Sequence, residues 1–190
     1  MYTDGYISKA KYTNHFGISV QETDEEWLNK FKKYLGYNGQ VHHYKVSNGY
    51  KIGTPYVRLL IGNNKIVENL EKAGVIENKT KKISSIPNVK YVDDFIRGVI
   101  DGDGSLRKKF PNVRICGNYT FLKEIGDYLG YNYKIYKDKS IYDIAFNKED
   151  SEKIERRLYE NAEVYLDRKY QIAKRSFNSP FISEDIKGIS

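Results

Sequence analysis

The chain has 190 residues, which suits one larger domain or two fused small ones and permits a substantial hydrophobic core. Its 32 Lys and Arg residues exceed its 25 Asp and Glu residues, and this net charge of +7, with 18 tyrosines, points toward a polyanion such as nucleic acid. The absence of an apolar run of about 18 residues excludes a membrane span, the start lacks a signal-peptide pattern, and one cysteine excludes an internal disulfide, so we expect an intracellular protein.

The first half of the chain predicts alternating strands and helices. A β-strand is expected over 4–13 and another over 16–20. An amphipathic helix over 27–38 follows, and its closing sequence YLGYN contains the glycine that is typical of a helix C-terminus. Strands over 40–46 and 55–61 and a polar helix over 63–74 complete this half.

The second half repeats this order, and YLGYN recurs at 128–132. The expected elements are strands at 103–110 and 112–116, a helix at 121–132, strands at 131–136 and 140–146, and a helix at 147–162. We therefore predict an α+β fold with a pseudo-twofold internal duplication. The expected organisation is a first repeat at 1–82, a linker at 83–90, a second repeat at 91–177 and a tail at 178–190.

In the segment FIRGVIDGDGSL, residues 95–106, a predicted apolar helix leads directly to two carboxylates, Asp101 and Asp103. The glycine at position 104 is expected to end this helix, which leaves Asp103 at its C-terminal end, where the helix dipole is already negative. A divalent cation would relieve that repulsion, because such ions prefer oxygen ligands. The other Asp-Gly pair, Asp4-Gly5, occupies the matching place in the first repeat.

IRGVIDGDG (96–104) resembles the LAGLIDADG signature of homing endonucleases, with Asp103 at the position of the metal-binding acid. The sequence that leads into it, NKTKKISSIPNVKYVDDF, resembles the join between the two repeats of single-chain members. YLDRKY (165–170) resembles the lysine-bearing segment that closes the second repeat. The resemblance extends over essentially the whole chain.

This resemblance implies two αββαββα units whose antiparallel strands form a saddle over double-stranded DNA, with the helices on the opposite face. It implies a monomeric enzyme that makes double-strand breaks in a long DNA target. Asp4 and Asp103 would be the metal ligands for Mg²⁺ (or Mn²⁺). Lys169, and less directly Lys79, would lie near the scissile phosphate, and Lys81 competes with Lys79 for that role because the alignment can slip there.

Basic side chains on the predicted strands are candidates for DNA contacts, because strands alternate faces and arginine or lysine can reach guanine O6 and N7 in the major groove. Lys9, Lys11 and Thr13 are expected to share one face of the first strand. The full set of DNA-binding candidates is Lys9, Lys11, His43, Lys45, Arg58, Arg107, Lys109 and Arg114.

The first signature is shorter than the second, because residues matching 92–99 would precede Met1. This favours either a chain that begins late or a degenerate member. Two alternatives to the nuclease follow: a DNA-binding regulator that has lost cleavage, and an RNA maturase with the same fold. An EF-hand calcium loop starting at Asp101 is excluded, because its sixth and twelfth positions hold Leu106 and Asn112.

Overall fold

The computed structural model describes residues 5–49, 51–75, 85–107 and 112–179. The chain divides into two compact units, Met1–Lys82 and Ile83–Ser190, called unit 1 and unit 2 below. Within the described ranges, no helix has both the length and the apolar character needed to cross a lipid bilayer.

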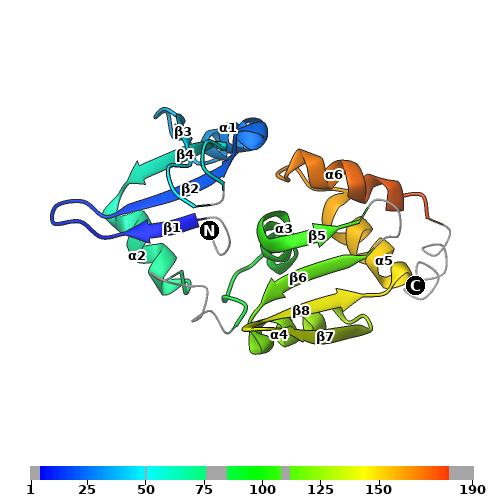
Figure 1. Cartoon of the computed structure of the whole chain (residues 1–190). Helices are drawn as coiled ribbons and strands as arrows, with labels where there is room; N and C mark the ends of the chain where they lie inside the picture. The colour runs from blue at the N-terminus through cyan, green and yellow to red at the C-terminus, as the bar shows by residue number, and fades with distance from the viewer. Residues whose placement is uncertain (1–4, 50, 76–84, 108–111, 180–190) are drawn as a thin grey trace. The chain divides into compact units, whose positions relative to one another are not determined.

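Unit 1 is a four-stranded antiparallel sheet whose helices cover one face (Figure 1). The strands are ordered β1-β2-β4-β3. The elements in chain order are β1 (Gly5–Ser8), β2 (His15–Gln21), the 3-10 turn η1 (Glu22–Asp24), α1 (Glu25–Tyr34), β3 (His42–Lys45), β4 (Pro55–Gly62) and α2 (Asn64–Lys72).

The core of unit 1 follows from the alternation along its strands. In β4, Val57, Leu59 and Ile61 are buried, while the residues between them face the other way. Burial of each such side chain contributes about 1.5–3 kcal/mol to folding. The helices supply the opposing apolar surface, and the buried cluster comprises Ile7, Phe16, Ile18, Leu28, Val57, Leu59, Ile61, Val67 and Val75.

Unit 2 repeats this sheet, with strand order β5-β6-β8-β7, and adds a long helix before it and two helical segments after it. Helices α3, α4 and α5 pack against the apolar side of the sheet (Figure 1). The elements are α3 (Val92–Asp103), β5 (Gly104–Leu106), β6 (Val113–Gly117), α4 (Tyr119–Leu129), β7 (Tyr133–Asp138), β8 (Ile141–Phe146), α5 (Lys148–Tyr159), α6 (Asp167–Ala173) and the 3-10 turn η3 (Lys174–Ser176).

Local sequence signals account for the helix ends in unit 2. Asn118 and Asn147 begin α4 and α5, because their side chains accept hydrogen bonds from the first free backbone N–H groups of each helix. Gly130 ends α4 in the left-handed conformation with φ +75°, and Gly36 adopts φ +62° just after α1. In both YLGYN sequences the helix therefore ends just before the glycine, or at it, as predicted.

Equivalent strand pairs in the two units have matching registers. Gly5 pairs with Ile18 in unit 1, and Gly104 pairs with Ile115 in unit 2. Ile18 then pairs with Leu59, as Ile115 pairs with Ile144. The predicted α+β fold with an internal duplication is confirmed.

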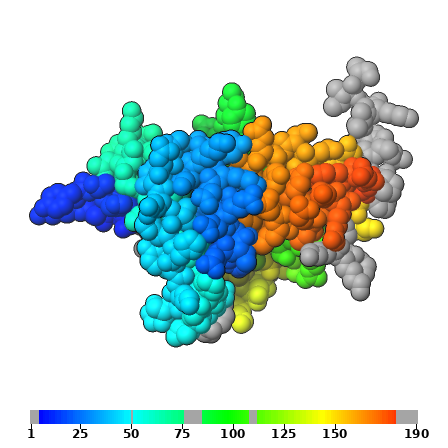
Figure 2. Space-filling model, turned by 90° about the horizontal axis from the view of Figure 1, so that it is seen from above, coloured from blue at the N-terminus to red at the C-terminus, as the bar shows by residue number. Residues whose placement is uncertain are grey.

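The predicted first strand was too long. β1 ends at Ser8, whose partner His15 begins β2, so residues 9–14 form the connection of a hairpin. Lys9, Lys11 and Thr13 therefore do not share a strand face. This connection projects from unit 1 (Figure 1), and the same protrusion is visible from above (Figure 2).

Candidate functional site

The signature segment forms α3 and the start of β5, and the junction requires a glycine. A Cβ atom on Gly104 would lie 2.6 Å from the carbonyl oxygen of Ile100, closer than real Cβ contacts allow. Helix α3 consequently ends at Asp103, and the chain leaves at once as β5. The predicted helix end at Gly104 is confirmed.

The two acids at this end of α3 have different environments. Asp103 is exposed, whereas Asp101 is only 8% exposed. One carboxylate oxygen of Asp101 accepts a 2.7 Å hydrogen bond from the hydroxyl of Tyr159, and the other accepts a 3.0 Å bond from the backbone N–H of Leu166. Asp101 thus ties α3 to α5 and to the start of α6.

Burial raises the pKa of Asp101 from 3.8 to about 6, although the hydrogen bonds from Tyr159 and Leu166 and the charges of Lys169 and Arg97 act in the opposite direction. Desolvation penalises the charged form, and these four partners recover part of that penalty. Both carboxylate oxygens of Asp101 are therefore used in contacts between helices, whereas the carboxylate of Asp103 is accessible to solvent.

Lys169 on α6 is buried directly beneath the end of α3. Its ammonium group donates hydrogen bonds to the carbonyl oxygens of Ile100, Asp101 and Gly104, at 2.5, 2.7 and 2.7 Å. Carbonyls at a helix C-terminus carry partial negative charge, so a cation here offsets the unfavourable placement of Asp103. The three bonds fix where α3 stops.

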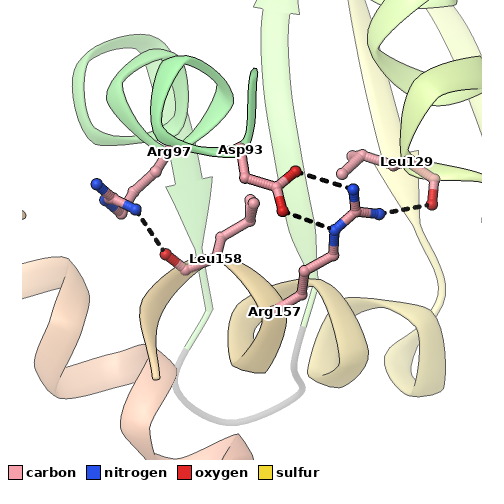
Figure 3. A network of polar contacts seen from close by, with 5 residues as sticks. All are labelled: Asp93, Arg97, Leu129, Arg157 and Leu158. Atoms are coloured by element: carbon pink, nitrogen blue, oxygen red, sulfur yellow. Dashed lines mark hydrogen bonds and ion pairs between the residues drawn. The ribbon is translucent and has the colours of Figure 1, made fainter. Parts of the chain in front are cut away.

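Two arginines attach the first half of α3 to α5 (Figure 3). Arg157 donates from Nε and Nη2 to the two carboxylate oxygens of Asp93, at 3.0 and 2.9 Å, and from Nη1 to the carbonyl of Leu129. Arg97, which is 8% exposed, donates to the carbonyls of Leu158 and Val164. These contacts set the orientation of the helix that carries Asp103.

Not every predicted catalytic residue falls within the described ranges. Asp4 and Lys79 lie outside them, so the site is described from Asp103 and Lys169 alone. Among the described residues, no three His, Cys, Asp or Glu side chains form a cluster that could hold a metal ion. The predicted roles of these four residues stay predictions.

The exposed face of the unit 1 sheet centres on Arg58 in β4. Its guanidinium donates to Ser19 Oγ at 3.2 Å and to the Tyr56 hydroxyl at 3.4 Å. The same group lies 5.1 to 5.8 Å from the ring centroids of Tyr44, Tyr56 and Tyr6. Stacking on aromatic faces is typical of arginine and holds its planar group in one orientation.

The exposed face of the unit 2 sheet includes two cross-strand rows with polar side chains. One row joins Ser105, Arg114, Ala145 and Lys134 across all four strands. The next joins Cys116, Asp143 and Tyr136, and the Cys116 thiol donates to Asp143 Oδ1 at 2.8 Å. Partial burial, together with the Asp143 carboxylate, raises the pKa of this thiol to about 11, so it remains a neutral donor.

The strand register also shows on which side of the unit 1 sheet the two candidates in β3 lie. His43 pairs with the buried Val57, so it lies on the side opposite Arg58, and its ring nitrogens are 3.2 and 3.3 Å from Glu22 and Glu25. Lys45 alternates to the same side as His43.

Two lysines lie in the β1–β2 connection. There Lys9 forms a 2.7 Å ion pair with Glu71, and Lys11 lies over the ring of Tyr12. Arg107 is exposed just after β5, and Lys109 lies outside the described residues. Their contacts with DNA stay predictions.

The sequence did not identify residues whose contacts are with positions far away along the chain. Tyr159, 58 positions from Asp101, gave no local sign of their hydrogen bond. Asp143 and His42 were also missed, although alternation along the strands could have placed them on the same faces as the predicted Arg114 and Arg58.

Two four-stranded antiparallel sheets of matching strand order, each covered by helices on one side, define a duplicated α+β fold. Solved structures narrow this class. The homing endonuclease I-WcaI bound to its DNA recognition sequence has a TM-score of 0.63 and 14% identity, over 90% of this chain and 81% of that one. The LAGLIDADG meganuclease I-AabMI bound to uncleaved DNA has a TM-score of 0.57 and 13% identity, over 93% and 86%. The chain has the LAGLIDADG homing endonuclease fold, as the signature predicted.

Comparison of sequences alone does not assign a family to this chain. The sequence matches no family model. A 119-residue stretch is 29% identical to the DNA-directed RNA polymerase subunit Rpo1C of Methanocaldococcus jannaschii, covering 60% of this chain and 13% of that protein. The match concerns a small part of that subunit and assigns no polymerase activity to this chain.

Proposed function

We propose that this protein is a site-specific DNA endonuclease of the homing type, acting as a monomer on a long duplex target. The observation that carries the proposal is the exposed acid Asp103, presented at the end of a helix that Lys169, Arg97 and Arg157 hold in place. The fold is shared with endonucleases whose structures contain DNA.

The end of α3 has the chemistry of a ligand for a hard cation. Asp103 supplies an exposed carboxylate, and the neighbouring helix carbonyls add negative potential. Asp103, with Asp4 from outside the described residues, would hold Mg²⁺. A bound divalent cation polarises a phosphoryl oxygen and lowers the pKa of water. One related structure, of I-SmaMI bound to an uncleaved DNA target, was obtained in the presence of calcium ions.

The chain's own residues orient this acid. Lys169 directs hydrogen bonds at three main-chain carbonyls, so its described role is to position the end of α3. Asp101 also accepts a hydrogen bond from the backbone N–H of Leu166, which immediately precedes α6. This contact fixes the start of the helix that carries Lys169. The two exposed sheet faces, with Arg58 and Arg114, are the surfaces proposed to meet the duplex.

The test has two stages. The full chain would first select duplexes from a randomised library in EDTA, and the enriched duplex would then be incubated with Mg²⁺. We expect double-strand cleavage by the wild type, and a loss of about 100-fold or more in Asp103→Asn, with DNA affinity preserved. Asp127→Asn, at an exposed acid on α4 that pairs with Lys123, is the matched control.

Each failure has its own meaning. Specific binding without cleavage in any divalent cation would favour a DNA-binding regulator. Preferential binding of intron RNA that survives Asp103→Asn would favour an RNA maturase. Unchanged cleavage by Asp103→Asn would place the catalytic centre elsewhere.

A further inference from the structure

The registers of the two sheets identify which positions of the duplication correspond. In unit 1, β2 pairs with β4 through Ser19 and Arg58, and β3 continues the row with His42. In unit 2, the equivalent row contains Cys116, Asp143 and Tyr136. Both rows lie one residue beyond the matched pairs Ile18–Leu59 and Ile115–Ile144. Arg58 and Asp143 therefore occupy the same place in their units.

Both side chains are held in the same way from the neighbouring strand. Ser19 Oγ accepts from Arg58 Nε, and Cys116 Sγ donates to Asp143 Oδ1. Each contact constrains one edge of the charged group. In each, another atom, Nη1 of Arg58 or Oδ2 of Asp143, has no hydrogen-bond partner among the described residues.

A carboxylate on a surface that meets duplex DNA is repelled by phosphates, so a DNA contact by Asp143 would be to a base edge. In the major groove a carboxylate accepts from the N4 amino group of cytosine, and an arginine fork donates to guanine O6 and N7. The tyrosines around Arg58 restrict its fork to one orientation, which suits a base edge better than a diffuse phosphate contact.

On the basis of the proposed function, we infer that Arg58 and Asp143 read different bases at equivalent positions of the two half-sites. Arg58 faces a guanine in the half-site of unit 1, and Asp143 faces a cytosine in the half-site of unit 2. The target consequently departs from a palindrome at this base pair, although the protein is internally duplicated. Cys116 is a positioning residue for Asp143.

The experiment is selection of duplexes from a randomised library by the full chain in EDTA, so that cleavage plays no part. The wild type should enrich guanine and cytosine at the two equivalent positions, each with about 5- to 150-fold discrimination. Arg58→Lys, which keeps the charge and removes the fork, should relax the guanine preference alone. Asp143→Asn should change cytosine to adenine, which asparagine reads through N6 and N7.

Asp143→Arg provides the sharpest variant, because it gives unit 2 the residue found in unit 1. It should convert the cytosine preference to guanine and make the enriched site more symmetric. Arg156→Lys and Glu149→Gln, on the helix layer where they pair with Glu160 and Lys153, are the matched controls and should leave every preference unchanged. Thermal melting of each variant identifies any loss of folding.

The outcomes separate the two proposals. An enriched site whose base preferences survive Arg58→Lys and Asp143→Asn, with affinity lowered equally for all sequences, would overturn base reading and leave the DNA-binding function standing. Failure of the wild type to enrich any duplex would overturn both. If single-stranded RNA, added as a competitor to the selection, displaced every duplex from the protein, both proposals would also be overturned.

Discussion

The Nζ atom of Lys169 lies 2.7 Å from the carbonyl oxygen of Gly104, so a side chain near the end of unit 2 fixes the turn that follows Asp103. The same ammonium group also bonds the carbonyls of Ile100 and Asp101. A buried lysine is normally expensive, but here the negative end of a helix and three acceptors stabilise its charge. The geometry of the proposed active site thus depends on a residue 66 positions from Asp103.

Replacement of Lys169 by methionine should destabilise unit 2 by about 2–5 kcal/mol, because three buried or partly buried carbonyls lose a charged donor. Urea denaturation followed by circular dichroism measures the change. The control is Lys123→Met on α4, whose ion pair with Asp127 has both side chains about half exposed and should contribute little. Equal stability of the two variants would contradict the anchoring role.

Asp101 and Tyr159 should behave as one energetic unit. Asp101→Asn weakens the acceptor for both Tyr159 and the Leu166 N–H, and Tyr159→Phe removes only the hydroxyl. We expect each single change to lower the free energy of unfolding by about 1–3 kcal/mol, and the double variant to lose clearly less than the sum. Strict additivity would show that their hydrogen bond contributes nothing measurable.

Glu155 should make stability depend on pH. It is 1% exposed, its Oε2 accepts from Ser176, and its Oε1 has no partner among the described residues. Burial first, and the charge of Glu152, raise its pKa from 4.5 to about 7. The folded protein therefore retains this proton between about pH 4.5 and 7, so the associated stability is fully present below the lower value and is lost as pH rises through the upper one.

Glu155→Gln removes this dependence while it keeps an acceptor for Ser176. The variant should be more stable than wild type at pH 8, by up to about 3 kcal/mol, and should show a flatter profile between pH 4.5 and 7. Unfolding free energies measured across pH for both proteins give the difference. Glu160→Gln, at an exposed pair with Arg156, should follow the wild-type profile. Parallel curves for all three proteins would contradict the assignment.

The two arginines on α3 and α5 should differ in importance. Arg157 and Asp93 form a bidentate but partly exposed pair, so a double-mutant cycle should give a coupling of about 0.5–1 kcal/mol that falls with added salt. Arg97 is buried, and Arg97→Met should lower stability by about 2–4 kcal/mol, because the carbonyls of Leu158 and Val164 lose their donor. The reverse order would indicate that burial does not control these contacts.

Much of the fold could be predicted because its signals are local. The two YLGYN segments, the asparagine caps and the alternation of apolar residues each act within a few positions, and the observed helices and strands agree with them closely. The error over 4–13 is also local in origin: β-like alternation continued past Ser8, but pairing with β2 ends there, because a strand needs a partner as well as a pattern.

The sequence by itself determined the duplication, the end of α3 at Gly104 and the position of Asp103, since these depend on spacing and on the conformational limits of single residues. Only the tertiary structure decided that Lys169 supports the end of α3, that Tyr159 holds Asp101, and that Arg58 and Asp143 are equivalent. The two hydrogen bonds join residues 65 and 58 positions apart through helix packing, and strand register matches Arg58 with Asp143 across 85 positions. Such relationships depend on how helices and strands pack and pair with one another, and a local residue pattern does not specify that packing.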